Sequence, residues 1–218
     1  GFLASLGAQA PPARQRVKAK QLVSDGNFRD ALAIYKQLAH DADNNPALVG
    51  DDLKQALQCL NRLNRQAEMD ALRDEAVRRH QGNWRLLLAA ARSVADGPHL
   101  GMIIAGEFRR GRGRGRGRYV NVVERDRVLA LRLLKQALPL VADENNKTLR
   151  GSFYLEFARI LLAGRGPGSS WRLTGLSDLT KLPDFEENRF GFMRRGFGGA
   201  PRGAPVDAEG QPVFHQAA

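Results

Sequence analysis

Three turn signals divide the first half of the chain into segments of similar length. Gly26, Asn64 and Gly97 each separate two stretches of helical periodicity, and the intervals between them are 38 and 33 residues. Periods in this range are typical of stacked helical hairpins, in which each helix pair buries its apolar face against the next pair. An array of that kind is built to present a surface, so we expect binding rather than catalysis.

Helical periodicity continues well beyond these turns. Apolar residues at spacings of three and four mark seven faces, and a helix before Gly26 brings the total to eight. The seven faces span residues 28–38, 53–60, 69–76, 84–91, 102–108, 131–141 and 153–161. Asn45-Pro46 predicts a helix start near Ala47, because Asn accepts a free backbone N–H and Pro has none to leave unsatisfied. Pro139 is expected to bend or end its helix. Eight helices with short connections predict four hairpins.

The turn at Gly26 is the one that most resembles a tetratricopeptide repeat. Aromatic Phe28, small Ala31 and large Tyr35 follow it in the order found in the second helix of such repeats. After Asn64, which tolerates the left-handed conformation, Gln66 and Met69 replace the aromatic and the small residue. The predicted fold class is therefore all-α, an irregular tetratricopeptide-like array of about four hairpins. An irregular all-α bundle is the alternative.

Composition divides the chain into four regions. Residues 14–163 form the predicted helical domain, and 218 residues with 43% hydrophobic content suffice for one core of that size. Residues 1–13 are interpreted as the end of a signal peptide or a disordered N-terminus, because Phe2–Ala10 ends in a small-residue cleavage pattern. Residues 164–185 are expected to be an extended covering segment. The Gly- and Pro-rich residues 186–218 suit a linker to a missing downstream domain.

Positive charge is concentrated in one short segment. Arg109–Arg118 alternates arginine with glycine, and removing its six arginines lowers the formal net charge from +11 to +5. Alternating glycine prevents a helix and disfavours a strand, which predicts a flexible cationic loop over residues 109–118. The candidate polyanion contacts are Arg112, Arg114, Arg116 and Arg118.

This loop leaves two interpretations open. Arginine-glycine tracts can follow a phosphate backbone and stack on bases, so the chain could be an RNA-binding adaptor. RNA-binding tracts usually interleave aromatic residues, however, and none occurs here before Tyr119. A solvated surface loop is the other interpretation.

The sequence contains no recognisable catalytic or metal-binding pattern. The four histidines have no metal-ligand spacing and are expected in surface or capping positions: His40, His80, His99 and His215. Asp51-Asp52 and Glu124–Arg127 are interpreted as charged helix starts, the latter exposed. Cys59 lies among apolar residues and is expected to be buried. We therefore predict no enzyme activity, no cofactor and no metal. The longest strictly apolar run, Leu86–Ala91, is too short to span a membrane.

Several segments together resemble the amino-terminal region of large bacterial alpha-2-macroglobulin-like proteins of the planctomycete type. The segments that carry the likeness are 49–53, 83–87, 105–108, 119–121 with 124–127, 176–179 with 182–185, and 203–207. The resemblance implies a helical module that follows a signal sequence and precedes macroglobulin β-sandwich domains. The chain would then be exported to the periplasm or cell envelope.

The same resemblance implies a function without chemistry in this part of the protein. Such proteins inhibit proteases with a bait region and often a Cys-Gly-Glu-Gln thioester, whereas Cys59 is followed here by Leu60-Asn61. The expected role is a protein-interaction scaffold. Its partner would be a protein or peptide, or neighbouring macroglobulin domains of the same polypeptide, with nucleic acid as the alternative.

Overall fold

A computed structural model describes residues 10–112, 117–162, 179–180, 182–183 and 185–187. These residues are mostly helical, as predicted. The helices are α1 (Pro12–Ser24), α2 (Phe28–His40), α3 (Val49–Arg62), α4 (Met69–Arg79), α5 (Trp84–Ala95), α6 (Val123–Ala142) and α7 (Lys147–Leu162), with a short 3-10 helix, η1 (Gln66–Glu68). The strands are β1 (Leu100–Ile104), β2 (Glu107–Arg110), β3 (Arg118–Asn121) and β4 (Glu186–Glu187).

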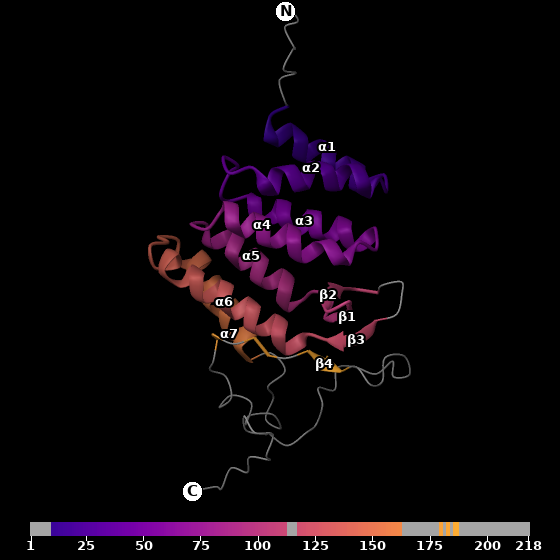
Figure 1. Cartoon of the computed structure of the whole chain (residues 1–218). Helices are drawn as coiled ribbons and strands as arrows, with labels where there is room; N and C mark the ends of the chain where they lie inside the picture. The colour runs from indigo at the N-terminus through magenta and orange to yellow at the C-terminus, as the bar shows by residue number, and fades with distance from the viewer. Residues whose placement is uncertain (1–9, 113–116, 163–178, 181, 184, 188–218) are drawn as a thin grey trace, which may run out of the picture.

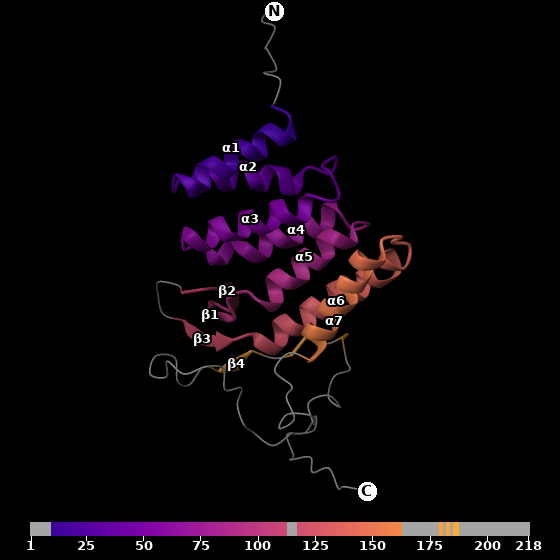
Figure 2. The same cartoon turned by 180° about the vertical axis from the view of Figure 1, so that it is seen from behind.

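The helices are stacked in the order of the chain. Figure 1 shows α1 and α2 at one end, α3 and α4 next to them, then α5, and α6 and α7 at the opposite end. The view from behind shows the same order, with the strands beside one end of α5 and α6 (Figure 2). Each layer contacts mainly its neighbours, so the contacts of the stack are local in sequence.

Helix α5 connects the two halves of the hydrophobic core. Leu86 and Ala90 pack into a cluster with α1–α4, while Leu87 and Ala91 pack into a second cluster with α6 and α7. All four side chains are fully buried. A helix that buries two different faces in two clusters lies between two other layers, and α5 therefore joins the N-terminal and C-terminal parts of the stack.

The first helix is held by an ion pair as well as by apolar contacts. Arg16 on α1 donates Nε and Nη2 to both carboxylate oxygens of Asp52 on α3, at 2.9 and 2.7 Å. Asn44 donates to Asp52 at 2.9 Å and to the Leu38 carbonyl at 2.6 Å. Asp52 is thus more than a helix-start residue, because it joins α1, α3 and the α2–α3 connection.

Most local turn predictions are confirmed. Gly26 and Asn64 have left-handed backbones, with φ of 79° and 56°. Asn83 caps α5 by accepting hydrogen bonds from the N–H groups of Arg85 and Leu86. Two helix boundaries differ from the prediction. The helix expected near Ala47 begins at Val49, since Asn45 forms a turn that accepts the N–H of Ala47 through its side chain. Helix α6 continues through Pro139 to Ala142.

The predicted helix over residues 102–108 is wrong, and a small sheet accompanies the mostly helical fold. These residues form the antiparallel hairpin β1–β2, in which Ile104 pairs with Glu107. The turn residues Ala105 and Gly106 have φ of 51° and 84°, and positive φ at both positions is the geometry of a tight hairpin turn. With this helix absent, seven of the eight predicted helices form within the described residues, and the predicted set of four helical hairpins is incomplete.

The hairpin is part of a small antiparallel sheet with strand order β2-β1-β3-β4. Arg109 and Arg110 belong to β2 and Arg118 begins β3, so the connection between strands is shorter than the loop predicted over 109–118. Strand β4 pairs with β3 through Val120↔Glu187 and Asn121↔Glu186. Residues 186 and 187, which we assigned to the linker, therefore lie in the sheet.

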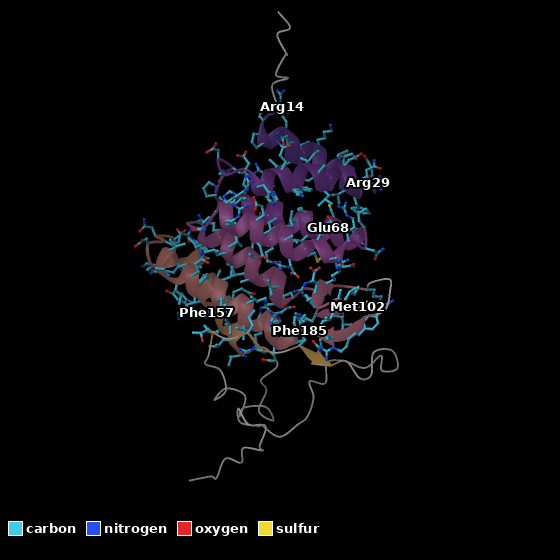
Figure 3. All side chains as sticks on the ribbon, in the orientation of Figure 1. Arg14, Arg29, Glu68, Met102, Phe157 and Phe185 are labelled. Carbon is cyan, nitrogen blue, oxygen red and sulfur yellow. The ribbon has the colours of Figure 1, made fainter. Side chains whose placement is uncertain are left out.

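The described part of the segment predicted as a cover, residues 164–185, contacts α6 and the sheet. Leu179 packs on the cluster of α5–α7 and its carbonyl accepts a hydrogen bond from Arg132. Phe185 stacks on Phe108 with 5.3 Å between ring centroids, near the sheet in Figure 3. The rest of that segment lies outside the described residues.

Gly101 provides a stability test of the sheet. A Cβ at Gly101 would lie 2.3 Å from Phe108 Cε2 and 2.6 Å from the Arg109 carbonyl oxygen. We expect Gly101→Ala to destabilise the fold by roughly 1–3 kcal/mol, the usual cost of overpacking. Urea unfolding measures the change. Gly82→Ala is the matched control, because no atom lies within 4 Å of its added Cβ. Equal stability of the two variants would contradict the packing described for β1.

Candidate functional site

A surface groove runs between α3 and α5 because two small residues let these helices approach closely. A Cβ on Gly50 would lie 3.1 Å from Ala89 Cβ and 3.3 Å from the Arg85 carbonyl oxygen. Gly50 and Ala89 therefore form the floor of the groove. Longer side chains one helical turn after each of them line its walls. The groove is a consequence of small residues at the helix crossing.

The part of the groove near the C-terminal ends of the helices contains an open hollow of about 400 Å³, lined by both polar and apolar residues. Lys54, Gln58 and Asn61 line it from α3, while Arg92, Ser93 and Asp96 line it from α5. Side-chain amides can donate and accept at the same time, so Gln58 and Asn61 are suited to hydrogen bonds with a peptide backbone.

The other part of the groove lies near the N-terminal ends of the two helices. Trp84, Leu88 and Leu149 line a second hollow of about 520 Å³, which shares Gly50, Asp51, Ala89 and Arg92 with the first. Leu149 comes from α7, and Arg85 is fixed here by a 2.7 Å ion pair with Glu144. The two hollows together form one continuous groove with polar and apolar side chains in both parts.

A buried charge cluster lies under the sheet, where the sequence predicted only an exposed helix start. Arg110 on β2 donates both terminal nitrogens to the carboxylate of Asp126 on α6, at 2.7 and 2.8 Å. It also donates Nε to Asp70 on α4 at 3.0 Å and Nη1 to the Pro98 carbonyl at 2.6 Å. The side chains of Arg110 and Asp126 are only 3% and 1% exposed. The prediction that residues 124–127 form an exposed charged start is therefore wrong for Asp126 and for the buried Arg127.

The electrostatics of this cluster favour its charged state. Burial opposes ionisation of Asp126, but hydrogen bonds from Arg110 and His99 and their positive charge lower the pKa of the carboxyl below its usual value of 3.8. The carboxylates of Asp126 and Asp70 raise the pKa of Arg110 despite its burial. No sequence signal marks the pair, because Arg110 looked like one of six equivalent loop arginines. Arg110 is distinguished from the others only by its partner Asp126, which lies 16 residues further along the chain.

His99 and Arg73 extend the buried charge cluster. His99 Nδ1 lies 2.8 Å from Asp126 Oδ2, and its Nε2 lies 3.1 Å from the carbonyl oxygen of Ala95, the last residue of α5. Arg73 donates to Asp70 at 2.7 Å and to Ser93 Oγ at 2.8 Å. Both ring nitrogens of His99 therefore lie within hydrogen-bond distance of an oxygen atom.

The four arginines proposed as polyanion contacts are only partly placed. Arg112 and Arg118 are exposed, beside the ends of β2 and β3. Arg114 and Arg116 lie outside the described residues. The other two arginines of the run differ from each other. Arg109 is exposed on β2, whereas Arg110 is held in the buried cluster.

Other chemical candidates are dispersed. Cys59 is buried, as predicted, and burial raises the pKa of its thiol. His80 is buried at the end of α4, with Nε2 3.2 Å from the carbonyl oxygen of Ala39. His215 lies outside the described residues. Among those described, no group of three or more His, Cys, Asp or Glu side chains could hold a metal ion, and no helix has the length and apolar character to cross a membrane.

Comparisons with known proteins add no functional assignment. No family model matches the chain, and neither a curated protein nor a solved structure matches it. The groove between α3 and α5 is therefore the candidate functional site on its geometry alone.

The buried Arg110–Asp126 pair predicts the acid sensitivity of the fold. The folded-state pKa of Asp126 lies below 3.8, so its contribution to stability is complete above that value and is lost as the pH falls through the folded-state pKa. We expect Asp126→Asn to destabilise the protein by roughly 3–5 kcal/mol at pH 7, because Arg110 loses its buried partner. The variant should also show a weaker pH dependence of the unfolding free energy below pH 4, measured by urea titration.

The exposed pair between Arg159 and Asp96 is the control for this experiment. Its side chains are 46% and 54% exposed, and exposed pairs contribute about 0–1 kcal/mol. Asp96→Asn should therefore leave stability almost unchanged. A loss for Asp126→Asn no larger than that of the control would refute the structural role of the buried pair.

Proposed function

We propose that the chain is a non-catalytic protein-interaction scaffold that binds an extended peptide segment in the groove between α3 and α5. One observation carries this proposal: two hollows are continuous along a floor of small residues, and both are lined by polar and apolar side chains. An extended chain presents backbone amides and alternate side chains along a line, and the groove offers amide side chains and apolar surface along its length.

The stacked arrangement supports a tetratricopeptide-like mode of presentation. Alternate helices α3 and α5 contact each other directly and both line the groove. Helical arrays commonly use the surface formed by successive helices to bind extended partners. The interpretation as a tetratricopeptide-like array rests on this similarity and on the Gly26 turn.

We further propose that the scaffold is the N-terminal module of an exported alpha-2-macroglobulin-like protein. The support is the likeness of residues 49–53, 83–87 and 119–127 to such proteins. In that setting, the peptide in the groove would come from a neighbouring macroglobulin domain or from another envelope protein. Finding β-rich sequence encoded downstream would support this assignment, and an unrelated downstream sequence would remove it.

The groove proposal predicts peptide binding that depends on Gln58 and Asn61. Peptides selected from a random displayed library on the purified chain should lose affinity in the double variant Gln58→Ala and Asn61→Ala. Loss of two hydrogen bonds at about 0.5–1.5 kcal/mol each predicts a decrease of roughly 5- to 150-fold. Isothermal titration calorimetry measures the affinity.

Two variants complete the design. Ala89→Phe places a large side chain on the groove floor and should abolish binding of the selected peptides. Lys20→Ala changes an exposed residue of α1 outside the groove and should leave affinity unchanged. Selected peptides that bind all variants equally would show that the groove is not the binding site.

The alternative function is polyanion binding through the arginine-glycine segment, favoured by the exposed Arg112 and Arg118 beside the sheet. It predicts salt-sensitive RNA binding that is lost when Arg112, Arg114, Arg116 and Arg118 are replaced by Ala. Fluorescence anisotropy with a labelled single-stranded RNA at two salt concentrations measures this. The charge-matched control replaces Lys18, Lys20, Arg29 and Arg62, all exposed on helices. Equal losses in both quadruple variants, or no binding by the wild type, would exclude a specific role for the segment.

A further inference from the structure

The described residues among 179–187, which we call the strap, lie on α6 and the sheet in the manner of a bound peptide. Arg132 donates Nε to the Leu179 carbonyl oxygen at 2.5 Å, and Arg125 donates Nη1 to the Pro183 carbonyl oxygen at 3.1 Å. The two arginines are about two helical turns apart on one side of α6. The strap therefore runs along α6 in the opposite direction, and side chains of α6 hold its backbone.

The aromatic residue of the strap has its own contacts on the sheet and on α6. Phe185, labelled in Figure 3, stacks on Phe108 of β2 with 5.3 Å between ring centroids and 27° between ring planes. The Arg125 guanidinium carbon lies 4.6 Å from the centroid of the Phe185 ring. A guanidinium at this distance attracts the face of an aromatic ring. Phe108 and Arg125 together form a receptor for one aromatic side chain.

The strap ends by adding a strand to the sheet. Figure 1 shows β4 beside β3, and the pairs are Val120↔Glu187 and Asn121↔Glu186. In the strand order β2-β1-β3-β4, β3 has β1 on one side and β4 on the other. Without β4, the outer N–H and C=O groups of β3 would be free to pair with another strand. Strand addition of this kind is a common mode of peptide recognition.

The strap can leave without opening the hydrophobic core. Of its residues with a described side chain, Thr180 is exposed, and the other four are only partly buried: Leu179, Leu182, Pro183 and Phe185. Segments with few buried side chains open at a much smaller free-energy cost than the core does. The strap therefore has the contacts of a ligand and not those of a core element.

We propose that α6, β2 and β3 form a peptide-recognition site, separate from the groove between α3 and α5, and that the strap is its ligand, bound in cis. The strap is then an autoinhibitory contact, because it covers the edge of β3. When it is released, the site accepts an extended segment of the same chemistry from another protein. That segment has a leucine, an aromatic residue six positions later and acidic residues directly after it, as in Leu179, Phe185 and Glu186-Glu187. Acidic residues suit a site that contains Arg125 and Arg132.

A labelled synthetic peptide with the sequence of residues 177–189 tests the site by fluorescence anisotropy. In the 218-residue wild-type chain, the strap competes with the peptide from a high effective concentration. Replacing both Leu179→Ala and Phe185→Ala in the chain weakens the strap and should raise the affinity for the peptide at least tenfold. Equal affinity of the two chains would overturn the proposal.

Further substitutions in the chain with the weakened strap locate the bound peptide. Adding Arg125→Ala and Arg132→Ala should lower the affinity at least tenfold. Adding Arg14→Ala and Arg29→Ala removes the same charge from exposed positions on α1 and α2, and the affinity should stay unchanged. Equal losses in both chains would show general charge attraction and refute a specific site on α6.

Cleavage of the chain tests the site with the strap and its contacts intact. A recognition sequence for a site-specific protease replaces residues 165–170, between α7 and the strap. After cleavage, excess peptide should displace the C-terminal fragment, which should then separate from the rest of the protein on size-exclusion chromatography. A fragment that stays bound in excess peptide would show that the strap is a permanent part of the fold, contrary to the proposal.

Discussion

The ion pair between Arg110 and Asp126 joins parts of the molecule that apolar packing alone would leave apart. Arg110 comes from the sheet and Asp126 from the first turn of α6, while Asp70 adds α4 and the Pro98 carbonyl adds the end of α5. Both charges are buried, and each is satisfied by several hydrogen bonds, which is the condition under which a buried pair is tolerated. The direction in which the chain leaves α5 and enters α6 depends on this cluster.

The groove depends on the position that the cluster gives to α5. One end of the groove is bounded by Ser93, Asp96, Gly97 and Pro98, the residues through which α5 passes into β1. Arg73 connects the two sites directly, because it donates to Asp70 in the cluster and to Ser93 in the groove wall. A change in the buried charges would therefore alter the groove without replacing any residue that a ligand touches. Stability and binding share one set of contacts at this end of α5.

Sequence reasoning was accurate where structure follows from neighbours along the chain. The faces of seven helices and the left-handed Asn64 depend on residues within four positions of one another. It was wrong at residues 102–108, where Met102, Ile103 and Phe108 fit helical spacing but the hairpin turn at Ala105-Gly106 prevailed. A short apolar run fits either structure. Pairing of β1 with β3, which is distant in sequence, further favours a strand over a helix for these residues.

The sequence by itself determined the mostly helical stack, the buried Cys59 and the arginine-rich segment, because periodicity, turn chemistry and composition are local properties. Tertiary structure alone decided that Arg110 of that segment pairs with a buried carboxylate and that Asp52 pairs with Arg16 on another helix. It also decided that Gly50 lies next to Ala89, where the two form the groove floor. Each of these depends on a partner far along the chain. Two charges attract each other strongly, and two small residues let their helices approach, only after folding has brought both residues together.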